Sequence, residues 1–303
     1  MRRNITRYRG EVRFWGLLLL VVAACGKDTK DAPRPQPAGQ DARAAGVVPD
    51  AAPQLKADSY PTLAAALAAI IPADARVIGI GEMHNRTDRK AVTSALSRFT
   101  TDGLPALADR MSDLIVETWF VDPKCGTEAQ KTTAKVEIKV RRPQETKSEI
   151  ALLAEAARAA RVQPHAMKLK CEDFEKVAPG GKDVKTDVML DLITSELGRI
   201  ADQAVAYRAK AADKRPWIAI YGGAMHNDRF PLKGLEQWSY AARVDQTTGN
   251  KYIEIDLIVP ELADGEEGAK TQPWYPLIAS TEPTVKVWQR GERSFVVLLP
   301  RSQ

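Results

Sequence analysis

Long apolar runs are scarce in this sequence of 303 residues, and none approaches the ~20 residues that a transmembrane helix needs. The apolar stretch near the amino terminus covers residues 14–24 and reads FWGLLLLVVAA. Five arginines and one glutamate precede it, and it ends in small residues directly before Cys25. This order of basic, apolar and small segments is typical of a secretory signal rather than of a permanent membrane span.

The end of this signal, residues 22–25 (VAAC), resembles a lipobox, in which the cysteine is acylated and becomes the new amino terminus. We therefore expect residues 1–24 to be a lipoprotein signal peptide and Cys25 to carry acyl chains such as palmitate, which anchor it to a membrane. Gly26 supplies no aspartate-type retention signal, so we expect the cell envelope, preferably the outer membrane, with the domain in the periplasm or at the surface. A plain secretory peptide with an incidental cysteine is the alternative.

The expected mature chain also has little net charge. The formal charge of the whole sequence is +5, but residues 1–24 contribute +4 of it, which leaves +1 from Cys25 onward. Because a nucleic-acid-binding domain is usually strongly basic, this composition argues against nucleic acid as a partner. We expect contact with a membrane through the lipid on Cys25, and a small molecule or a peptide as ligand.

Large apolar residues are almost missing between residues 25 and 59, where proline, alanine, aspartate and lysine prevail. Such a segment buries too little surface to offset the entropy lost on ordering, so we expect a disordered tether behind the lipidated Cys25. Residues 60–303 suffice for one sizeable domain, and no long repeat divides them.

The pattern of residues 60–303 predicts a single α/β domain. Apolar residues at helical spacing predict helices at 60–71, 88–110, 144–160 and 185–213. Short apolar or alternating runs predict strands at 76–81, 113–118, 166–171, 217–221, 252–259, 285–288 and 294–299. Strands that alternate with helices indicate a mainly parallel sheet covered by helices. The last two strands are expected to be antiparallel, at an edge of the sheet.

Cysteine is rare, with three copies in the chain. If Cys25 is lipidated, Cys125 and Cys171 remain, and in an oxidising compartment such a pair favours one disulfide. Two separate buried thiols are the alternative, because the distance between the two side chains depends on the fold.

Histidine is equally rare, yet two of the three copies, His84 and His226, follow predicted strands in matching Gly-x-x-His contexts. Ligands of a parallel sheet bind beyond the carboxyl ends of its strands, so these two side chains are expected to meet there. Glu82 and Glu117 lie at the ends of the first two predicted strands and complete the expected site.

Two further acids, Asp173 and Asp228, follow the third and fourth predicted strands and are secondary candidates for this site. His165 precedes its predicted strand, so we expect it at the opposite end of the sheet. Trp119, Phe120 and the loop 121–144 are expected to form either walls of the pocket or part of the core.

These side chains suit two kinds of chemistry. Imidazole and carboxylate groups are ligands for a divalent transition metal, which would activate a water molecule and polarise a carbonyl. Alternatively, a histidine oriented by a glutamate acts as a general base without a metal. Taken singly, each residue is more often a loop histidine, a helix cap or an ion pair, and the repetition of the motif favours a shared site.

Several motifs resemble the superfamily that groups erythromycin esterase-like proteins, ChaN-type haem-binding lipoproteins and TraB/Tiki proteins. They are VIGIGEMHN at 77–85, LIVE at 114–117, YGGAMH at 221–226 and SFVVLLP at 294–300. The first motif and the lipoprotein signal are most similar in sequence to the ChaN-type branch, and this resemblance implies haem binding. The Tiki-like branch implies a metal-dependent peptidase, and the esterase-like branch implies metal-free activation of water against a lactone.

Carried over by motif, the residues that correspond to those of the Tiki-like branch are Glu82, His84, Glu117 and His226. The esterase-like branch implies a histidine and glutamate pair. We therefore expect an extracytoplasmic hydrolase of ester, lactone or peptide bonds, with these four residues as catalytic groups or as metal ligands. The alternative is a lipoprotein that binds haem or another iron-containing ligand in the same cleft without catalysis. A structural envelope lipoprotein with a degenerate site is the third alternative.

Overall fold

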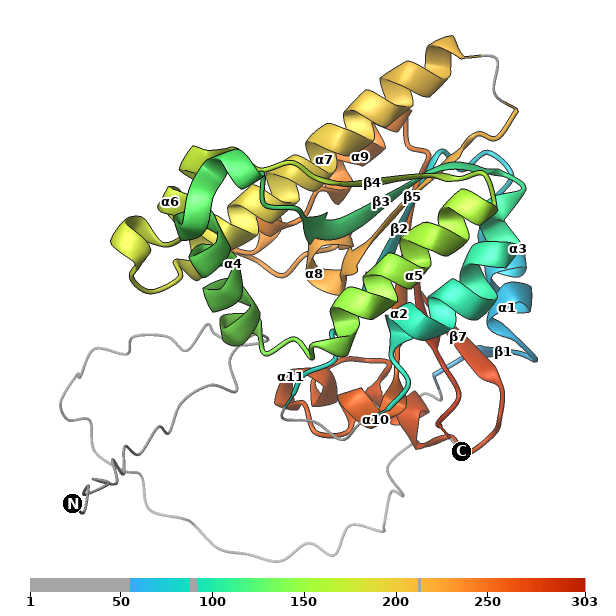
Figure 1. Ribbon diagram of the computed structural model, residues 1–303. Helices are drawn as coiled ribbons and strands as arrows, with labels where there is room; N and C mark the ends of the chain where they lie inside the picture. Colours follow the sequence, from blue (N-terminus) through green and yellow to red (C-terminus); the bar gives the residue numbers. More distant parts are fainter. Residues whose placement is uncertain (1–54, 88–91, 212–213, 303) are drawn as a thin grey trace, which may run out of the picture.

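The computed structural model describes residues 55–87, 92–211 and 214–302. The expected signal peptide, Cys25 and most of the expected tether lie outside the described residues. A single eight-stranded sheet, in the order β1-β7-β8-β6-β2-β5-β3-β4, forms the centre of the described part (Figure 1). Its strands are β1 (Asp58–Tyr60), β2 (Val77–Glu82), β3 (Met111–Trp119), β4 (Gln163–Met167), β5 (Trp217–Gly223), β6 (Tyr252–Ile258), β7 (Val285–Gly291) and β8 (Ser294–Leu298).

Most neighbouring strands of this sheet are parallel. β2 lies between β5 and β6, and it is parallel to both; the pairs β3–β5, β3–β4 and β6–β8 are parallel as well. β7 is antiparallel to β8 and to β1. The predicted α/β class, with a mainly parallel sheet and antiparallel strands at one edge, is confirmed.

Helices cover both faces of the sheet. One face carries α1 (Leu63–Ile70), α2 (Ala95–Arg98), the π-helical turn η1 (Phe99–Gly103), α3 (Leu104–Ala108) and α5 (Glu145–Ala159). The other carries α4 (Gly126–Val140), α6 (Cys171–Val177), α7 (Thr186–Lys210) and α9 (Ala241–Thr248). Short helices fill the connections: η2 (Pro123–Cys125), η3 (Pro179–Gly181), α8 (Ala224–Asn227), η4 (Glu236–Trp238), α10 (Pro260–Ala263), α11 (Glu267–Lys270) and η5 (Tyr275–Ala279).

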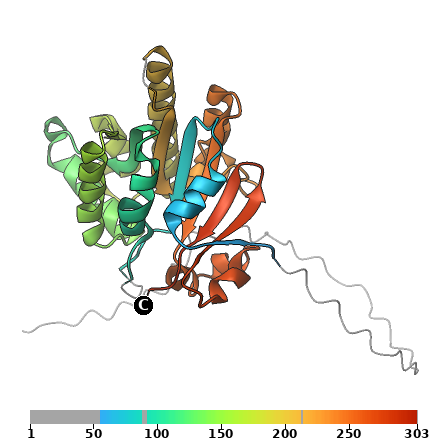
Figure 2. The ribbon, with the colours of Figure 1, turned by 90° about the vertical axis from the view of Figure 1, so that its right-hand side faces the viewer.

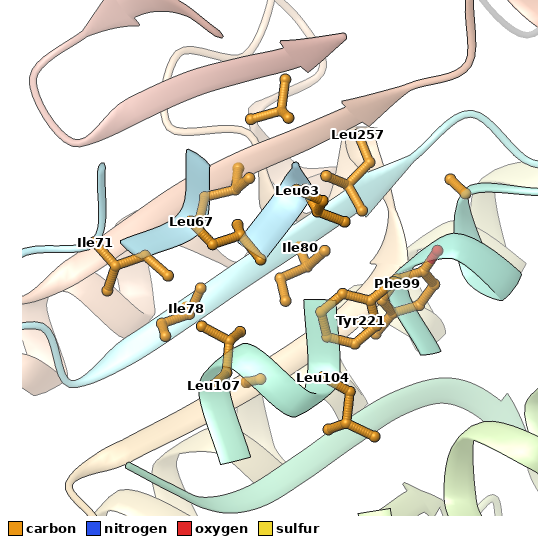
Figure 3. Packing of buried hydrophobic residues seen from close by; sticks show 14 of the residues in the cluster. Leu63, Leu67, Ile71, Ile78, Ile80, Phe99, Leu104, Leu107, Tyr221 and Leu257 are labelled. Carbon is orange, nitrogen blue, oxygen red and sulfur yellow. The ribbon is translucent and has the colours of Figure 1, made fainter. Parts of the chain in front are cut away.

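The central strands are apolar on both sides because both faces of the sheet are covered. In β2, Ile78 and Ile80 pack toward α1 and α3, as Figure 3 shows, whereas Val77 packs on the opposite side. The ring of Tyr221 stacks on Phe99, with 5.0 Å between ring centroids. Tyr221 lies near the carboxyl end of β5, and this packing buries its ring.

Some predicted boundaries are wrong. The strand predicted at 166–171 is β4, Gln163–Met167, because Cys171 already starts α6, where Asp173 accepts a hydrogen bond from the backbone N–H of Lys170. His165 therefore lies within this strand rather than before it. The segment 121–144, expected to be a loop, contains η2 and α4.

Two other boundaries near the amino terminus also differ. The expected tether 25–59 overlaps β1, which pairs with β7 at the sheet edge, so the folded region includes residues 58 and 59. Figure 2 shows the blue strand β1 beside the red strand β7. In the expected helix 88–110, α2 begins only after the N-cap Ser94, and the π-helical turn η1 follows it.

The predicted disulfide is confirmed. Cys125 and Cys171 are bonded, with 4.9 Å between their Cα atoms and 46 residues of separation in the chain. The bond joins the start of α4 to the start of α6 on one face of the sheet. Among the helices in the described residues, none is long and apolar enough to cross a membrane.

Candidate functional site

The site is built around His84, two residues beyond the end of β2. Its Nδ1 lies 2.8 Å from Oε1 of Glu82, the last residue of the strand. The other carboxylate oxygen of Glu82 accepts a hydrogen bond of 2.6 Å from the hydroxyl of Tyr221 on β5. Because Glu82 is buried and held on both oxygens, it fixes the orientation of the imidazole of His84.

Glu117 reaches the same place from β3, on the other side of β5. Its Oε2 accepts a hydrogen bond of 2.6 Å from the backbone N–H of Gly223. The carboxylate has room because Gly222 carries no side chain: a Cβ there would lie 2.5 Å from Oε2 of Glu117. The paired glycines at the end of β5 therefore allow a carboxylate and an imidazole to approach the strand closely.

His226 lies on α8, which follows β5 directly, and it is only 3% exposed. Its Nδ1 is 2.8 Å from Oγ1 of Thr194 and 3.0 Å from the carbonyl oxygen of Trp238. The Thr194 hydroxyl donates its proton to that same carbonyl at 2.9 Å, so both neighbours of Nδ1 act as acceptors. Nδ1 of His226 therefore carries the proton, and the lone pair is on Nε2.

The two histidines and Glu117 meet around Gly223. A Cβ at Gly223 would lie 3.1 Å from Nε2 of His84, 3.5 Å from Oε2 of Glu117 and 3.7 Å from Cδ2 of His226. The structure therefore brings all four residues of the expected site, Glu82 included, to the carboxyl edge of the sheet.

Arg142 completes the site and was not expected from the sequence. Its Nη2 lies 2.7 Å from Nε2 of His84 and 3.1 Å from Oε1 of Glu117. α4 ends at Val140, Arg141 adopts a left-handed conformation, and Arg142 then points back into the site. Figure 1 shows the connection from α4 to α5 passing below the carboxyl ends of the strands. The only sequence signal is a basic pair before Pro143, which does not reveal where the side chain lies.

The contacts of His84 define its proton position. A guanidinium only donates, so Nε2 of His84 accepts from Arg142, and Nδ1 carries the proton toward Glu82. Burial and the charge of Arg142 act to lower the pKa of His84, but its contacts with Glu117 and Glu82 outweigh them and raise it above the ordinary value. His84 is therefore a stronger base than a free histidine, and it is 28% exposed to solvent.

The pKa values of Glu117 and His226 are lowered, in contrast to that of His84. Burial acts to raise the pKa of Glu117, yet the contact with His84 and the charge of Arg142 outweigh it and hold the pKa well below the usual range. Burial lowers the pKa of His226, despite the opposing charge of Glu117. At neutral pH, Glu117 is thus ionised and His226 neutral.

These four residues do not fit a metal centre in their present arrangement. Both ring nitrogens of His84 are engaged, and the guanidinium of Arg142 lies between His84 and Glu117, where a bridging cation would have to be. In the described ranges, no group of three or more His, Cys, Asp and Glu side chains is arranged to hold a metal ion. Arg142 thus lies between the imidazole of His84 and the carboxylate of Glu117.

The secondary candidates lie outside the site. Asp173 caps α6 and pairs with Lys176 at 2.9 Å. Asp228 pairs with Arg290 at 2.7 Å and accepts from the backbone N–H of Phe230, so it stabilises the turn after α8. Both aspartates have structural roles here.

The third histidine and the two aromatic residues after Glu117 are also apart from the four. Nε2 of His165 lies 2.8 Å from Asp113, near the start of β3. Trp119 donates from Nε1 to Thr133 on α4, and Phe120 is 75% exposed. Trp119 is partly buried and packs against the core on the α4 side of the sheet, whereas Phe120 does not.

Comparison with protein-family models and with curated proteins gave no match. Two solved structures align with most of this chain. The type III effector HopBA1 is 12% identical, with a TM-score of 0.42, over 82% of this chain and 99% of the effector. A crystal structure of a Bacillus cereus protein is 10% identical, with a TM-score of 0.37, over 78% of this chain and 90% of that protein.

Proposed function

We propose that this chain is a hydrolase of carbonyl compounds (esters, lactones or peptides) that activates water with His84 and needs no metal. The observation that carries the proposal is the chain of contacts from Tyr221 through Glu82 to His84. A carboxylate that fixes the imidazole tautomer and stabilises the imidazolium is the arrangement that general-base catalysis requires. The raised pKa of His84 strengthens the base.

His84 would take a proton from a water molecule through Nε2, and the oxygen of that water would form the new bond to the carbonyl carbon. In the structure Nε2 accepts a hydrogen bond from Arg142, so the guanidinium has to move from Nε2 to the substrate when a substrate binds. A carbonyl oxygen does so, because it gains negative charge as the bond forms and attracts the guanidinium. Arg142 then stabilises the oxyanion, and Glu117 holds Arg142 beside it.

His226 forms the inner wall of this site. It is neutral, its Nδ1 proton is held by Thr194 and Trp238, and it contributes a lone pair on Nε2 rather than a charge. This supports a role in holding the attacking water by accepting a hydrogen bond. The haem-binding alternative stays a prediction, and no contact in this site favours it.

A panel of esters, lactones and peptides, tested with wild-type protein, His84→Asn and His165→Asn, examines this proposal. His165 is a matched control, because its Nε2 also lies 2.8 Å from a carboxylate, that of Asp113, but away from the four site residues. We expect hydrolysis of at least one class, a loss of about 100-fold or more in His84→Asn, and little change in His165→Asn. Absence of hydrolysis across the panel, or equal rates in all three proteins, contradicts the proposal.

We also propose that the enzyme is held on the periplasmic or outer surface of a membrane by lipid on Cys25. The support is the sequence of residues 1–25, which combines a basic, an apolar and a small-residue segment with a cysteine. Fractionation of cells that express wild type or Cys25→Ala tests it. We expect wild type in the membrane fraction and Cys25→Ala released from it; retention of both in the membrane excludes a lipid anchor.

A further inference from the structure

A second carboxyl group, Glu149 on α5, faces the same cavity as Glu82 and His84. The cavity is small, about 10 Å³, which is room for about one water molecule. Its lining residues are Glu82, His84, Asn85, Ser94, Leu96, Arg142, Thr146 and Glu149. All but Leu96 are polar, so the space is suited to polar atoms.

One oxygen of Glu149 is fixed. Its Oε1 accepts a hydrogen bond of 2.8 Å from Oγ of Ser94, the N-cap of α2. Within the described ranges, Glu149 forms no ion pair with a lysine or an arginine. Its second oxygen therefore has no protein partner that requires it to be charged.

The surroundings favour the neutral form of this carboxyl group. Burial raises the pKa of Glu149, and the nearby charges of Glu82 and Glu145 raise it further, against the hydrogen bond from Ser94. His84 and Arg142 also line the cavity, but both are engaged with Glu82 and Glu117. Glu149 and Glu82 thus share one cavity, and only Glu82 is in contact with the histidine that acts as the base. Carboxyl groups in such different surroundings commonly take different roles in one reaction.

We infer that Glu149 is the general acid of the reaction and gives its proton to the leaving group; this rests on the proposed hydrolase function. His84 takes one proton from water, and the water oxygen bonds to the carbonyl carbon. The bond from that carbon to the leaving oxygen or nitrogen then breaks, and this atom takes the proton of Glu149. The proton on His84 passes through solvent to the Glu149 carboxylate, so the net change is the addition of one water.

A purely structural role is the alternative, because the bond between Ser94 and Glu149 joins α2 to α5. The two roles differ in their dependence on the leaving group. A poor leaving group such as an alkoxide needs a proton as it departs, whereas a nitrophenolate departs without one. A structural defect would slow both reactions equally.

The test compares Glu149→Gln with wild type on two esters of the same acid, an alkyl ester and a p-nitrophenyl ester. Glutamine can still accept from Ser94 but has no acidic proton. We expect kcat/KM to fall about 100-fold or more for the alkyl ester and less than about threefold for the nitrophenyl ester. Equal losses on both esters, or no loss on either, overturn the assignment.

Controls separate this inference from the function on which it rests. Glu155→Gln, at an exposed position of α5 outside the cavity lining, should keep the wild-type rates on both esters. His84→Asn should lose both reactions. A wild-type protein that cleaves neither ester, nor any other ester, lactone or peptide of the panel, overturns the hydrolase proposal together with this one. A wild-type protein that cleaves only the nitrophenyl ester contradicts the general acid alone.

A measurement on unmodified protein covers the case in which Glu149→Gln does not fold. Carboxyl ¹³C resonances of wild type report the titration of each glutamate. We expect Glu149 to release its proton at a higher pH than an ordinary glutamate does. Titration of Glu149 in the ordinary glutamate range or below it overturns the assignment.

Discussion

Arg142 donates a hydrogen bond of 2.7 Å to Nε2 of His84, the atom that has to accept a proton from water. The same guanidinium nitrogen lies 3.1 Å from Glu117. A fixed cation thus connects a histidine and a carboxylate that the sequence alone would equally assign to a metal. Because the charge of Arg142 disfavours the imidazolium, this contact also sets how basic His84 is.

Replacement of Arg142 with glutamine should therefore raise the pKa of His84 further above its ordinary value. The rising limb of kcat/KM against pH follows the loss of a proton from His84, so it should move to higher pH. The maximal rate should fall about 100-fold or more, because one donor to the oxyanion is lost. A limb that stays in place or moves to lower pH would show that Arg142 does not act on His84.

Substitution of Gly222 with alanine should disturb the site from the strand side. The added Cβ would lie 2.5 Å from Oε2 of Glu117 and would displace this carboxylate from Gly223 and Arg142. We expect activity to fall on the order of 100-fold, as for other small displacements of catalytic groups. Gly198→Ala on α7 is the control, because its Cβ would meet only contacts of 3.4 Å or more. Equal activity of the two variants would mean that Glu117 is not needed in its observed position.

Asp113 should make folding sensitive to acid. Burial acts to raise the pKa of this carboxyl, but hydrogen bonds with His165, Arg208 and Ser112 outweigh it and hold the pKa well below the usual range. A carboxyl of this kind stabilises the fold above the pKa that it has in the unfolded chain, and the contribution disappears as the pH falls toward the folded-state pKa.

Asp113→Asn should therefore lower the free energy of unfolding at neutral pH by about 1.5–3 kcal/mol, since it removes the charge-assisted hydrogen bonds with Arg208 and His165. The difference from wild type should shrink as the pH falls below the ordinary aspartate range. Denaturant unfolding at several pH values measures it. Asp74→Asn, which removes an exposed pair with Arg293, should have a much smaller effect. A difference that stays constant with pH contradicts this account.

The disulfide should stabilise the fold and hold α4 in place. A loop of 46 residues predicts about 4 kcal/mol of stabilisation from the entropy of the unfolded chain. The double variant Cys125→Ser and Cys171→Ser should unfold at correspondingly lower denaturant concentration, and reductant should lower the stability of wild type alone. Since α4 leads into Arg142, the double variant should also lose activity. Unchanged stability of the double variant would contradict the prediction.

Parts of this site could be predicted from the sequence for a simple reason. Apolar strands that alternate with helices make a parallel sheet, and the carboxyl ends of its strands meet at one edge, so Glu82, His84, Glu117 and His226 had to approach one another. Arg142 and Glu149 could not be found in this way. They belong to the connection after α4 and to α5, whose positions over the sheet depend on tertiary packing rather than on any local pattern. α4 was expected to be a loop because lysine, threonine and glutamate make up much of this helix. Few of its side chains are buried, so its sequence shows little apolar periodicity.

The central claim is that His84 activates water without a metal. The most direct test is kcat/KM for the best substrate of the panel, measured on wild type and His84→Asn after metal is removed with a chelator and its absence is verified by elemental analysis. We predict that wild type keeps its full rate and that His84→Asn loses about 100-fold or more. A wild-type rate that disappears with the metal and returns on addition of a divalent ion would contradict the account.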